Sequence, residues 1–158
     1  MEKARELRFV WLLMAAATVG FIWQQSTLSP SASLEASDAV EEVIVPMVGG
    51  PTSVLGSFLD RFMRKIAHFT EFALLGLECE LYLFGRHTPL RTVLLLAFGL
   101  LIGACDEILQ IFTGRGAAFT DVLIDFSGYL TAVGLTWLVA KLALGIYKKR
   151  KADATAAS

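Results

Sequence analysis

Apolar residues gather in four long blocks along this chain, and polar or charged residues separate the blocks. A helix needs about 20 mainly apolar residues to cross the hydrocarbon core of a bilayer. The first block is shorter than this length and the fourth is longer, but a modest mismatch is tolerated. The pattern predicts an all-α fold, a bundle of four membrane-spanning helices at residues 9–23, 66–84, 92–112 and 122–147.

Lys and Arg are distributed unevenly between the segments that join these blocks. Cytoplasmic loops of membrane proteins carry an excess of these two residues. They occur in residues 1–8, in the turn between the second and third blocks and in residues 148–158, whereas residues 24–60 contain none. This pattern predicts a cytoplasmic N-terminus (1–8), a membrane domain (9–147) and a basic cytoplasmic tail (148–158), with residues 24–60 outside.

The first block has a second interpretation, as a secretory signal peptide. Its charged start, its apolar run and the small residues at 31–33 are typical of such a segment. The bulky side chains of Trp11, Phe21 and Trp23, and the lack of a clear cleavage site, favour a permanent helix. Cleavage would leave the orientation of the three later helices unchanged.

The outer connection divides into a polar half and a semi-apolar half. Residues 26–38 are rich in Ser and Ala, which predicts a flexible segment. After Pro51, the apolar residues Leu55, Phe58 and Phe62 recur at helical spacing. We therefore expect a short amphipathic helix on the outer surface that turns into the second membrane helix.

Composition supports a membrane protein and excludes several other classes. Of the 158 residues, 55% are hydrophobic, and the mean hydropathy is +0.60, which is rare for a soluble domain. The formal net charge of −1 predicts no nucleic-acid partner. Cys79 and Cys105 lie inside apolar blocks, which predicts small buried side chains rather than a disulfide. Residues 152–158 are expected to form a disordered tail.

Ionisable and polar residues in and beside the three later blocks form the most informative pattern. Charged groups are costly in hydrocarbon and usually have a function there. If the helices alternate in direction, these residues fall at the same depth near the outer surface. They predict a polar pocket at the outer leaflet, formed by Arg64, Lys65, His68, Glu71, Asp106, Glu107, Gln110, Arg115, Asp121 and Asp125.

An anionic lipid headgroup fits this set of residues. The basic side chains can hold a phosphate, and His68 titrates near neutral pH, so we assign it as general base or nucleophile. The acids outnumber the bases, which predicts that they orient His68 or bind a divalent cation through oxygen ligands. The predicted catalytic residues are His68, Asp106, Glu107, Asp121 and Asp125; the substrate-binding residues are Arg64, Lys65, Glu71, Gln110 and Arg115; the metal ligands are Asp106, Glu107, Asp121 and Asp125.

Several of these residues also have simpler explanations. His68 can be an interfacial residue, Asp121 can cap a helix, and the basic residues can extend to lipid headgroups. Glu107 and Asp125 are harder to explain in this way, because each lies about one turn inside the membrane. A purely structural interpretation makes the whole set a network of hydrogen bonds between helices.

Two runs of residues resemble, in order and spacing, the signature motifs of VanZ-like membrane proteins. Two features depart from the family pattern: Asp125 stands where the family commonly has Asn, and the Pro that the family often has before its Gly-Arg pair is missing at 114–115. The resemblance covers residues 61–134 and rests on RKIAHF at 64–69, LLG at 74–76, DEILQIF at 106–112, GR at 114–115, and on Asp121, Asp125 and Gly128.

The resemblance implies a multi-pass protein of the bacterial cytoplasmic membrane with a function in the cell envelope. The family takes its name from a protein associated with resistance to the glycopeptide teicoplanin. VanZ-like proteins have been proposed to resemble membrane enzymes that process lipid headgroups, such as phosphatidylserine-synthase-like enzymes. The residues that the resemblance carries over are Lys65, His68, Asp106, Glu107, Gln110, Arg115, Asp121, Asp125 and Gly128.

Two functions therefore stay open. The first is phosphodiester or pyrophosphate transfer or hydrolysis on a phosphate-containing lipid or a lipid-linked headgroup of the cell envelope. The second is non-enzymatic binding of a lipid-linked cell-wall precursor or of a glycopeptide. The expected partner is a membrane lipid or a lipid-linked precursor in the first case, and a lipid-linked precursor or a glycopeptide in the second.

Overall fold

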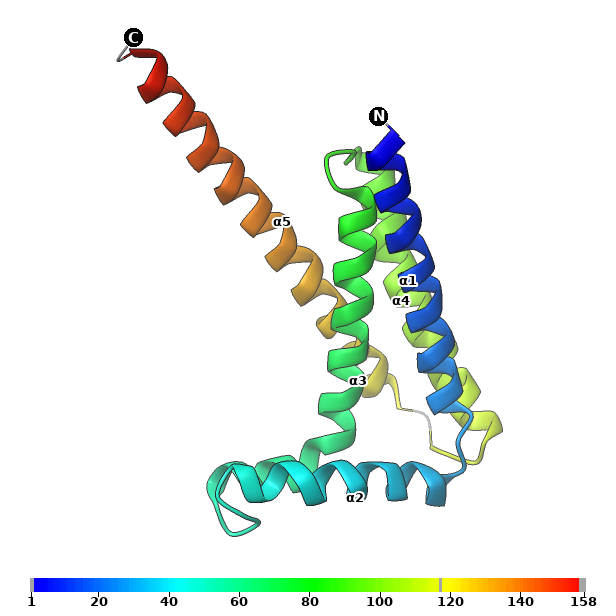
Figure 1. Cartoon of the computed structure of the whole chain (residues 1–158). Coiled ribbons are helices and arrows are strands. Elements are labelled where there is room, and N and C mark those ends of the chain that lie inside the picture. Colours follow the sequence, from blue (N-terminus) through cyan, green and yellow to red (C-terminus); the bar gives the residue numbers. More distant parts are fainter. Residues whose placement is uncertain (1, 117, 157–158) are drawn as a thin grey trace.

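The computed structural model describes residues 2–116 and 118–156. These residues form five α-helices and no β-strand, which confirms the predicted all-α fold. Helices α1, α3, α4 and α5 alternate in direction, and the start of α1 and the end of α5 lie at the same end of the bundle (Figure 1). The helices are α1 (Glu2–Ser26), α2 (Pro30–Met47), α3 (Val54–Leu83), α4 (Pro89–Phe112) and α5 (Phe119–Ala156).

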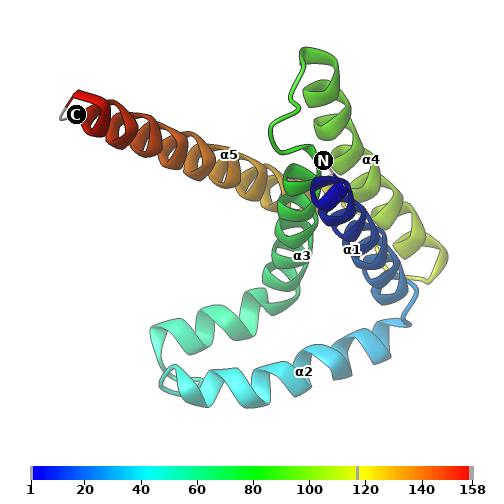
Figure 2. The same cartoon turned by 45° about the horizontal axis from the view of Figure 1, so that its top comes forward.

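Helix α3 is the central element of the fold. It packs against all four other helices, whereas the second half of α5 leaves the bundle (Figures 1 and 2). The side chains of Phe72 and Leu75 on α3 are fully buried, together with Ile22 of α1 and Tyr129 of α5. The core therefore forms around α3, and its polar residues can face protein rather than lipid.

Helix α2 shows that the prediction of a flexible segment at residues 26–38 is wrong. The Ser29 hydroxyl caps the helix by accepting the Ala32 N–H, and Pro30 occupies the first helical position, where no N–H is needed. Helix α2 lies across the end of the bundle opposite to the start of α1 (Figure 1). This helix therefore covers the end at which the predicted polar residues were expected.

The predicted surface helix and the second membrane helix form one continuous helix, α3. Ser53 caps it through the Gly56 N–H. The first turns of α3 lie near α2, and the helix then bends into the bundle (Figure 2). Leu55 and Phe58 are exposed on these first turns, which suits a segment that lies at an interface.

Among the described residues, three helices are long and apolar enough to cross a membrane, namely Arg5–Ser26, Pro89–Phe112 and Phe119–Tyr147. Helix α3 is not among them, because its apolar stretch contains Glu71, Glu78 and Glu80. Helix α3 thus has the composition of a helix that other helices surround.

The last helix is longer than expected. The backbone of α5 continues to Ala156, so the prediction that residues 152–158 form a disordered tail is wrong for the residues up to Ala156. Residues 157 and 158, and the side chains of the basic tail from residue 148 onward, lie outside the description.

Candidate functional site

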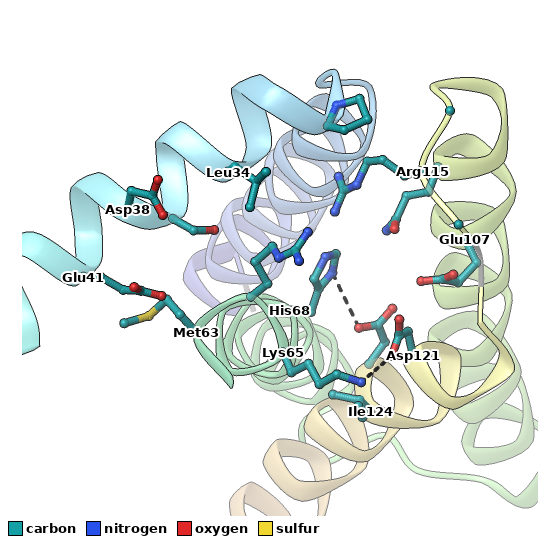
Figure 3. Close-up of a pocket in the computed structure, with 17 residues that line it drawn as sticks. Leu34, Asp38, Glu41, Met63, Lys65, His68, Glu107, Arg115, Asp121 and Ile124 are labelled. Atoms are coloured by element: carbon teal, nitrogen blue, oxygen red, sulfur yellow. Dashed lines mark hydrogen bonds and ion pairs between the residues drawn. The ribbon is translucent and has the colours of Figure 1, made fainter. Parts of the chain in front are cut away.

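A polar cavity of ≈590 Å³ lies where α2 crosses the end of the bundle (Figure 3). Its walls come from α2, α3, α4, the start of α5 and the loop between α4 and α5. Asp106 lies behind the cavity wall, and Glu71 lines a smaller adjoining cavity of ≈250 Å³. The other predicted site residues line the main cavity: Arg64, Lys65, His68, Glu107, Gln110, Arg115, Asp121 and Asp125.

Close packing of α5 on α3 brings their polar residues together. A Cβ atom at Gly128 would overlap the Phe69 carbonyl, and one at Gly76 would overlap the Tyr129 carbonyl. Glycine at both positions lets the two backbones touch, as small residues do in membrane bundles. Asp125 lies about one turn before Gly128 and therefore comes close to His68, which directly precedes Phe69.

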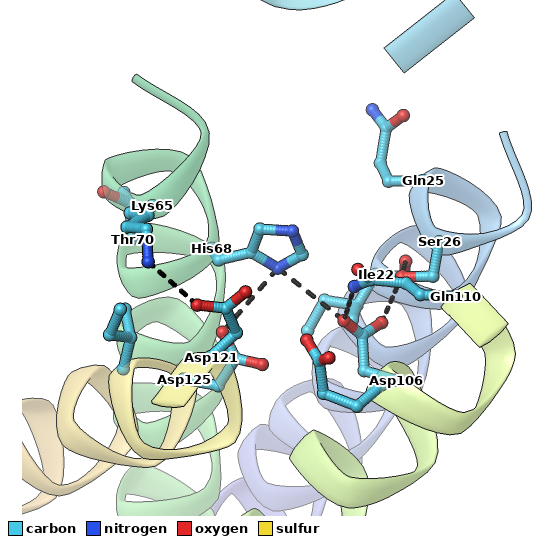
Figure 4. A network of polar contacts seen from close by, with 12 residues as sticks. Ile22, Gln25, Ser26, Lys65, His68, Thr70, Asp106, Gln110, Asp121 and Asp125 are labelled. Carbon is cyan, nitrogen blue, oxygen red and sulfur yellow. Dashed lines mark hydrogen bonds and ion pairs between the residues drawn. The ribbon is translucent and has the colours of Figure 1, made fainter. Parts of the chain in front are cut away.

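His68 lies between two buried aspartates (Figure 4). Its Nδ1 atom is 3.6 Å from Asp106 Oδ2 and 3.6 Å from Asp125 Oδ1. Both distances exceed the usual hydrogen-bond range, so Nδ1 lies between the two carboxylates without a hydrogen bond to either. Asp106 and Asp125 are 0% exposed, whereas the His68 side chain is 19% exposed. The second ring nitrogen, Nε2, points away from both acids (Figure 4).

The two aspartates differ in how they are held. Asp106 accepts a hydrogen bond from the Ser26 hydroxyl and another from Gln110 Nε2, at 2.8 Å. Neither oxygen of Asp125 has a hydrogen-bond partner among the described residues, and nor does His68 Nδ1. Buried polar atoms are nearly always hydrogen-bonded, so these atoms indicate a group that the protein alone does not supply.

The atoms that can bind a metal differ from the set expected from sequence. One donor atom each from His68, Asp106 and Asp125 lies within 4.8 Å of the others. Glu107 instead accepts the Ala118 N–H at 3.0 Å, and Asp121 pairs with Lys65. Among the described residues, the group of possible ligands therefore contains two of the four predicted carboxylates, Asp106 and Asp125, together with His68.

Basic side chains form part of the cavity lining, namely Arg64, Lys65 and Arg115. Arg115 Nη1 donates to the Gln25 carbonyl at 3.3 Å, and Gly114 before it has a φ of 77°, a conformation that glycine adopts without strain. Lys65 Nζ lies 3.0 Å from Asp121 Oδ1, and these side chains are 48% and 35% exposed. An ion pair this exposed is weak, so Lys65 can turn to another anion at little cost.

Sequence reasoning missed the part of the site that comes from α1 and α2. Ser26 of α1 holds Asp106, and α2 supplies one wall of the cavity, including Asp38 and Glu41. The Ser29-Pro30 pair is a helix-start signal that could have revealed α2. No local pattern indicates the contact of Ser26 with Asp106, because 80 residues separate them.

Three apolar helices around a buried, partly polar fourth one define this chain as a small α-helical membrane protein with a polar cavity at one end. A family model described as VanZ/LLP1 matches residues 9–140. The chain therefore belongs to the VanZ/LLP1 family, as the sequence motifs predicted. No curated protein and no solved structure matches the chain significantly. The family match includes residues 9–26 of α1, a helix that also packs against α3 and α4.

Proposed function

We propose that α1, α3, α4 and α5 all cross the cytoplasmic membrane of a bacterium, with both termini inside and the cavity at the outer leaflet. The alternating directions of these helices support this topology (Figure 1). The uneven distribution of Lys and Arg gives the orientation. Glu78 and Glu80 are 1% and 2% exposed, so α3 can cross because these charges face the bundle interior.

The same topology argues that α1 is kept in the mature protein. Ile22 of α1 is part of the core, and Ser26 hydrogen-bonds Asp106. Cleavage near residues 31–33 would remove both contacts, so a signal peptide would not leave the site unchanged. In this proposal α2 lies on the outer surface and covers the cavity.

The cavity binds the phosphate group of a lipid or of a lipid-linked precursor of the cell envelope. One observation carries this proposal: basic side chains line a cavity together with His68 and Asp125, which form a buried group with Asp106 behind them. Arg side chains suit phosphate oxygens because they can donate two parallel hydrogen bonds. The volume of ≈590 Å³ lies in the range of sites that hold a small molecule or a headgroup.

The reaction is transfer or hydrolysis of a phosphodiester or pyrophosphate bond. In hydrolysis, a water oxygen forms a bond to phosphorus, the bond from phosphorus to the leaving oxygen breaks, and the proton of the water reaches that oxygen. His68 can accept the proton at Nε2 only while Nδ1 carries its own hydrogen. If Nδ1 held a metal together with Asp106 and Asp125 instead, Nε2 would carry the hydrogen, and the ion rather than His68 would supply the acid-base chemistry. The two roles of His68 therefore exclude each other.

A product assay tests the enzymatic proposal. Purified protein in nanodiscs of bacterial lipid extract is incubated with a panel of divalent cations, and headgroup products are followed by mass spectrometry. We expect a product with the unchanged protein and none with His68→Ala, provided that circular dichroism shows the same helix content in both. Equal turnover in the two proteins would contradict a role for His68.

Non-enzymatic binding is the second candidate, and the basic wall of the cavity favours it. Arg64, Lys65 and Arg115 can hold a phosphate without any reaction. Under this alternative the cavity sequesters a lipid-linked cell-wall precursor or a glycopeptide, which would connect the protein to glycopeptide resistance. A lipid that copurifies without forming a product, and that is lost with Arg115→Ala, would favour this function over catalysis.

A further inference from the structure

We propose that His68, Asp106 and Asp125 form a mononuclear site for a first-row transition-metal dication, with Zn²⁺ as the reference ion. The inference rests on the proposed function and deepens it, because it gives this buried group a defined chemistry. It also revises the metal set expected from sequence, which consisted of carboxylates alone.

The distances between the donor atoms fit a shared ion better than a hydrogen bond. His68 Nδ1 is 3.6 Å from an oxygen of each aspartate. Two ligands of a tetrahedral zinc ion, each about 2.1 Å from the metal, lie about 3.4 Å from each other. A hydrogen bond between nitrogen and oxygen is rarely longer than about 3.2 Å. All three donor atoms lie within 4.8 Å of one another, and bringing the two carboxylate oxygens to the ligand separation of about 3.4 Å would place all three on one ion.

The environment of Asp125 indicates a bound cation independently of these distances. Its side chain is fully buried, and neither of its oxygens has a hydrogen-bond partner among the described residues. An ionised carboxylate in this position is costly unless it is paired or binds a metal. The single Nδ1 atom of His68 cannot donate to Asp106 and Asp125 at once. A dication balances both carboxylates.

Two neighbouring side chains donate hydrogen bonds to Asp106, as residues around a metal site commonly do to a ligating carboxylate. The Ser26 hydroxyl donates to Oδ1, and Gln110 Nε2 donates to Oδ2 at 2.8 Å. Such contacts fix the direction of a ligating carboxylate and are usual in metal sites. The support comes from α1 and α4, so the site would join four helices into one unit.

The position of the three residues leaves the ion open to a ligand. His68 and Asp125 both line the cavity, and so do Arg64 and Arg115. Catalytic zinc sites use three protein ligands and keep a further position for water or substrate. A phosphate could then contact the ion and the arginines together. The imidazole nitrogen favours zinc, copper, iron or nickel over calcium and magnesium, which prefer oxygen ligands alone.

A zinc titration tests the site without any reaction. The full chain is purified in detergent, freed of metal with a chelator and titrated with ZnCl₂ by calorimetry, and Co²⁺ absorption reports the coordination geometry. We expect one Zn²⁺ per chain. Asp125→Asn should weaken binding at least about tenfold, the loss that even an outer-shell change causes. Asn has almost the same size and shape as Asp, so this variant should fold.

Two other carboxylates of the cavity provide matched controls. Asp121→Asn and Glu107→Gln remove the same charge beside the site, but their side chains pair with Lys65 and the Ala118 N–H. We expect both variants to keep the zinc affinity within about threefold, below the loss for a ligand or its outer shell. Absence of stoichiometric binding, or a loss in the controls with normal binding in Asp125→Asn, would overturn the assignment.

The nanodisc assay, run with and without chelator, separates the metal site from the proposed function. Product that forms equally with chelator, in a protein that binds no zinc, overturns the metal site and leaves the enzyme with His68 as base. Zinc binding by the three residues, with no product from any lipid, supports the metal site and argues against catalysis. Product that requires zinc and Asp125 supports both.

Discussion

The two ends of the helical bundle both bury carboxylates, but only one of them combines these acids with a polar cavity. At the end covered by α2, Asp125 is buried without a hydrogen-bond partner among the described residues and lines the cavity. At the other end, Glu80 Oε1 lies 2.8 Å from His87 Nε2, and Glu78 is also buried. One oxygen of each glutamate has no hydrogen-bond partner in the described chain.

The surroundings of these acids differ as much as their partners do. A groove of ≈760 Å³ between α1, α3 and α4 reaches toward the other end, and its lining is almost entirely apolar apart from Arg86 and Arg91. The cavity under α2 is lined by both acids and bases. A buried charge alone is therefore weak evidence of function. An unsatisfied charge that a polar ligand can reach is much stronger evidence.

The two histidines give the largest expected contrast between these ends. His68→Ala should lower headgroup turnover by at least about 10²-fold, because it removes either an acid-base group or a metal ligand. His87→Ala removes the other histidine, at the opposite end, and should leave turnover within a few-fold. Initial rates in nanodiscs measure both variants. Equal losses would remove the functional distinction between the two ends.

Glycine contacts test whether close packing of α5 on α3 positions the site. Gly128→Ala should destabilise the protein by about 2 kcal/mol, because the new methyl group overlaps the Phe69 carbonyl. Gly134→Ala, further along α5, meets no atom within 4 Å and should be neutral or slightly stabilising. Thermal unfolding in detergent compares the two. Similar stability of both variants would argue against the close contact beside Asp125.

Neutral substitutions at the buried acids should have opposite effects at the two ends. In metal-free protein, Asp125→Asn should stabilise by about 1 kcal/mol, because it removes a buried charge that has no hydrogen-bond partner in the described chain. Glu80→Gln should destabilise by a similar amount, because it weakens the contact with His87. Unfolding is monitored by circular dichroism. With added Zn²⁺, the unchanged protein should become more stable than Asp125→Asn, because the variant binds the ion more weakly. Destabilisation of metal-free Asp125→Asn, or equal stabilisation of both proteins by Zn²⁺, would contradict this account.

The exposed ion pair of Lys65 and Asp121 should matter least for stability. Lys65→Met should change the free energy of unfolding by less than ~0.5 kcal/mol, since exposed pairs contribute little. The same variant should still weaken binding of phosphate-containing lipid, because Lys65 lines the cavity. Lipid binding and thermal unfolding are measured on one preparation. A large loss of stability without a change in lipid binding would make Lys65 a structural residue.

The sequence predicted the helical fold and the residues around the cavity for a physical reason. Charged groups in apolar segments are costly, so the places where they persist are visible in one dimension. The Ser and Ala content of residues 30–47 resembles that of a flexible linker, so composition does not predict the helix there, although the Ser29-Pro30 pair marks its start.

The directions of side chains and the contacts between distant residues could not be predicted from the sequence. Asp106 and Glu107 are adjacent on α4, yet Asp106 faces His68 and Glu107 turns to the loop at Ala118. Successive helical residues point about 100° apart, so the metal set depends on a rotation that composition does not reveal. The Ser26 contact with Asp106 joins two helices that are distant in sequence.

Native mass spectrometry of the protein released from nanodiscs tests the central claim, that the end under α2 binds a phosphate headgroup. Arg115→Ala removes a basic side chain of the cavity, and Arg91→Ala removes one at the opposite end as a matched control. The account predicts a retained phosphate-containing lipid in the unchanged protein and in Arg91→Ala, and its loss in Arg115→Ala. Equal retention in all three proteins, or a loss confined to Arg91→Ala, would contradict it.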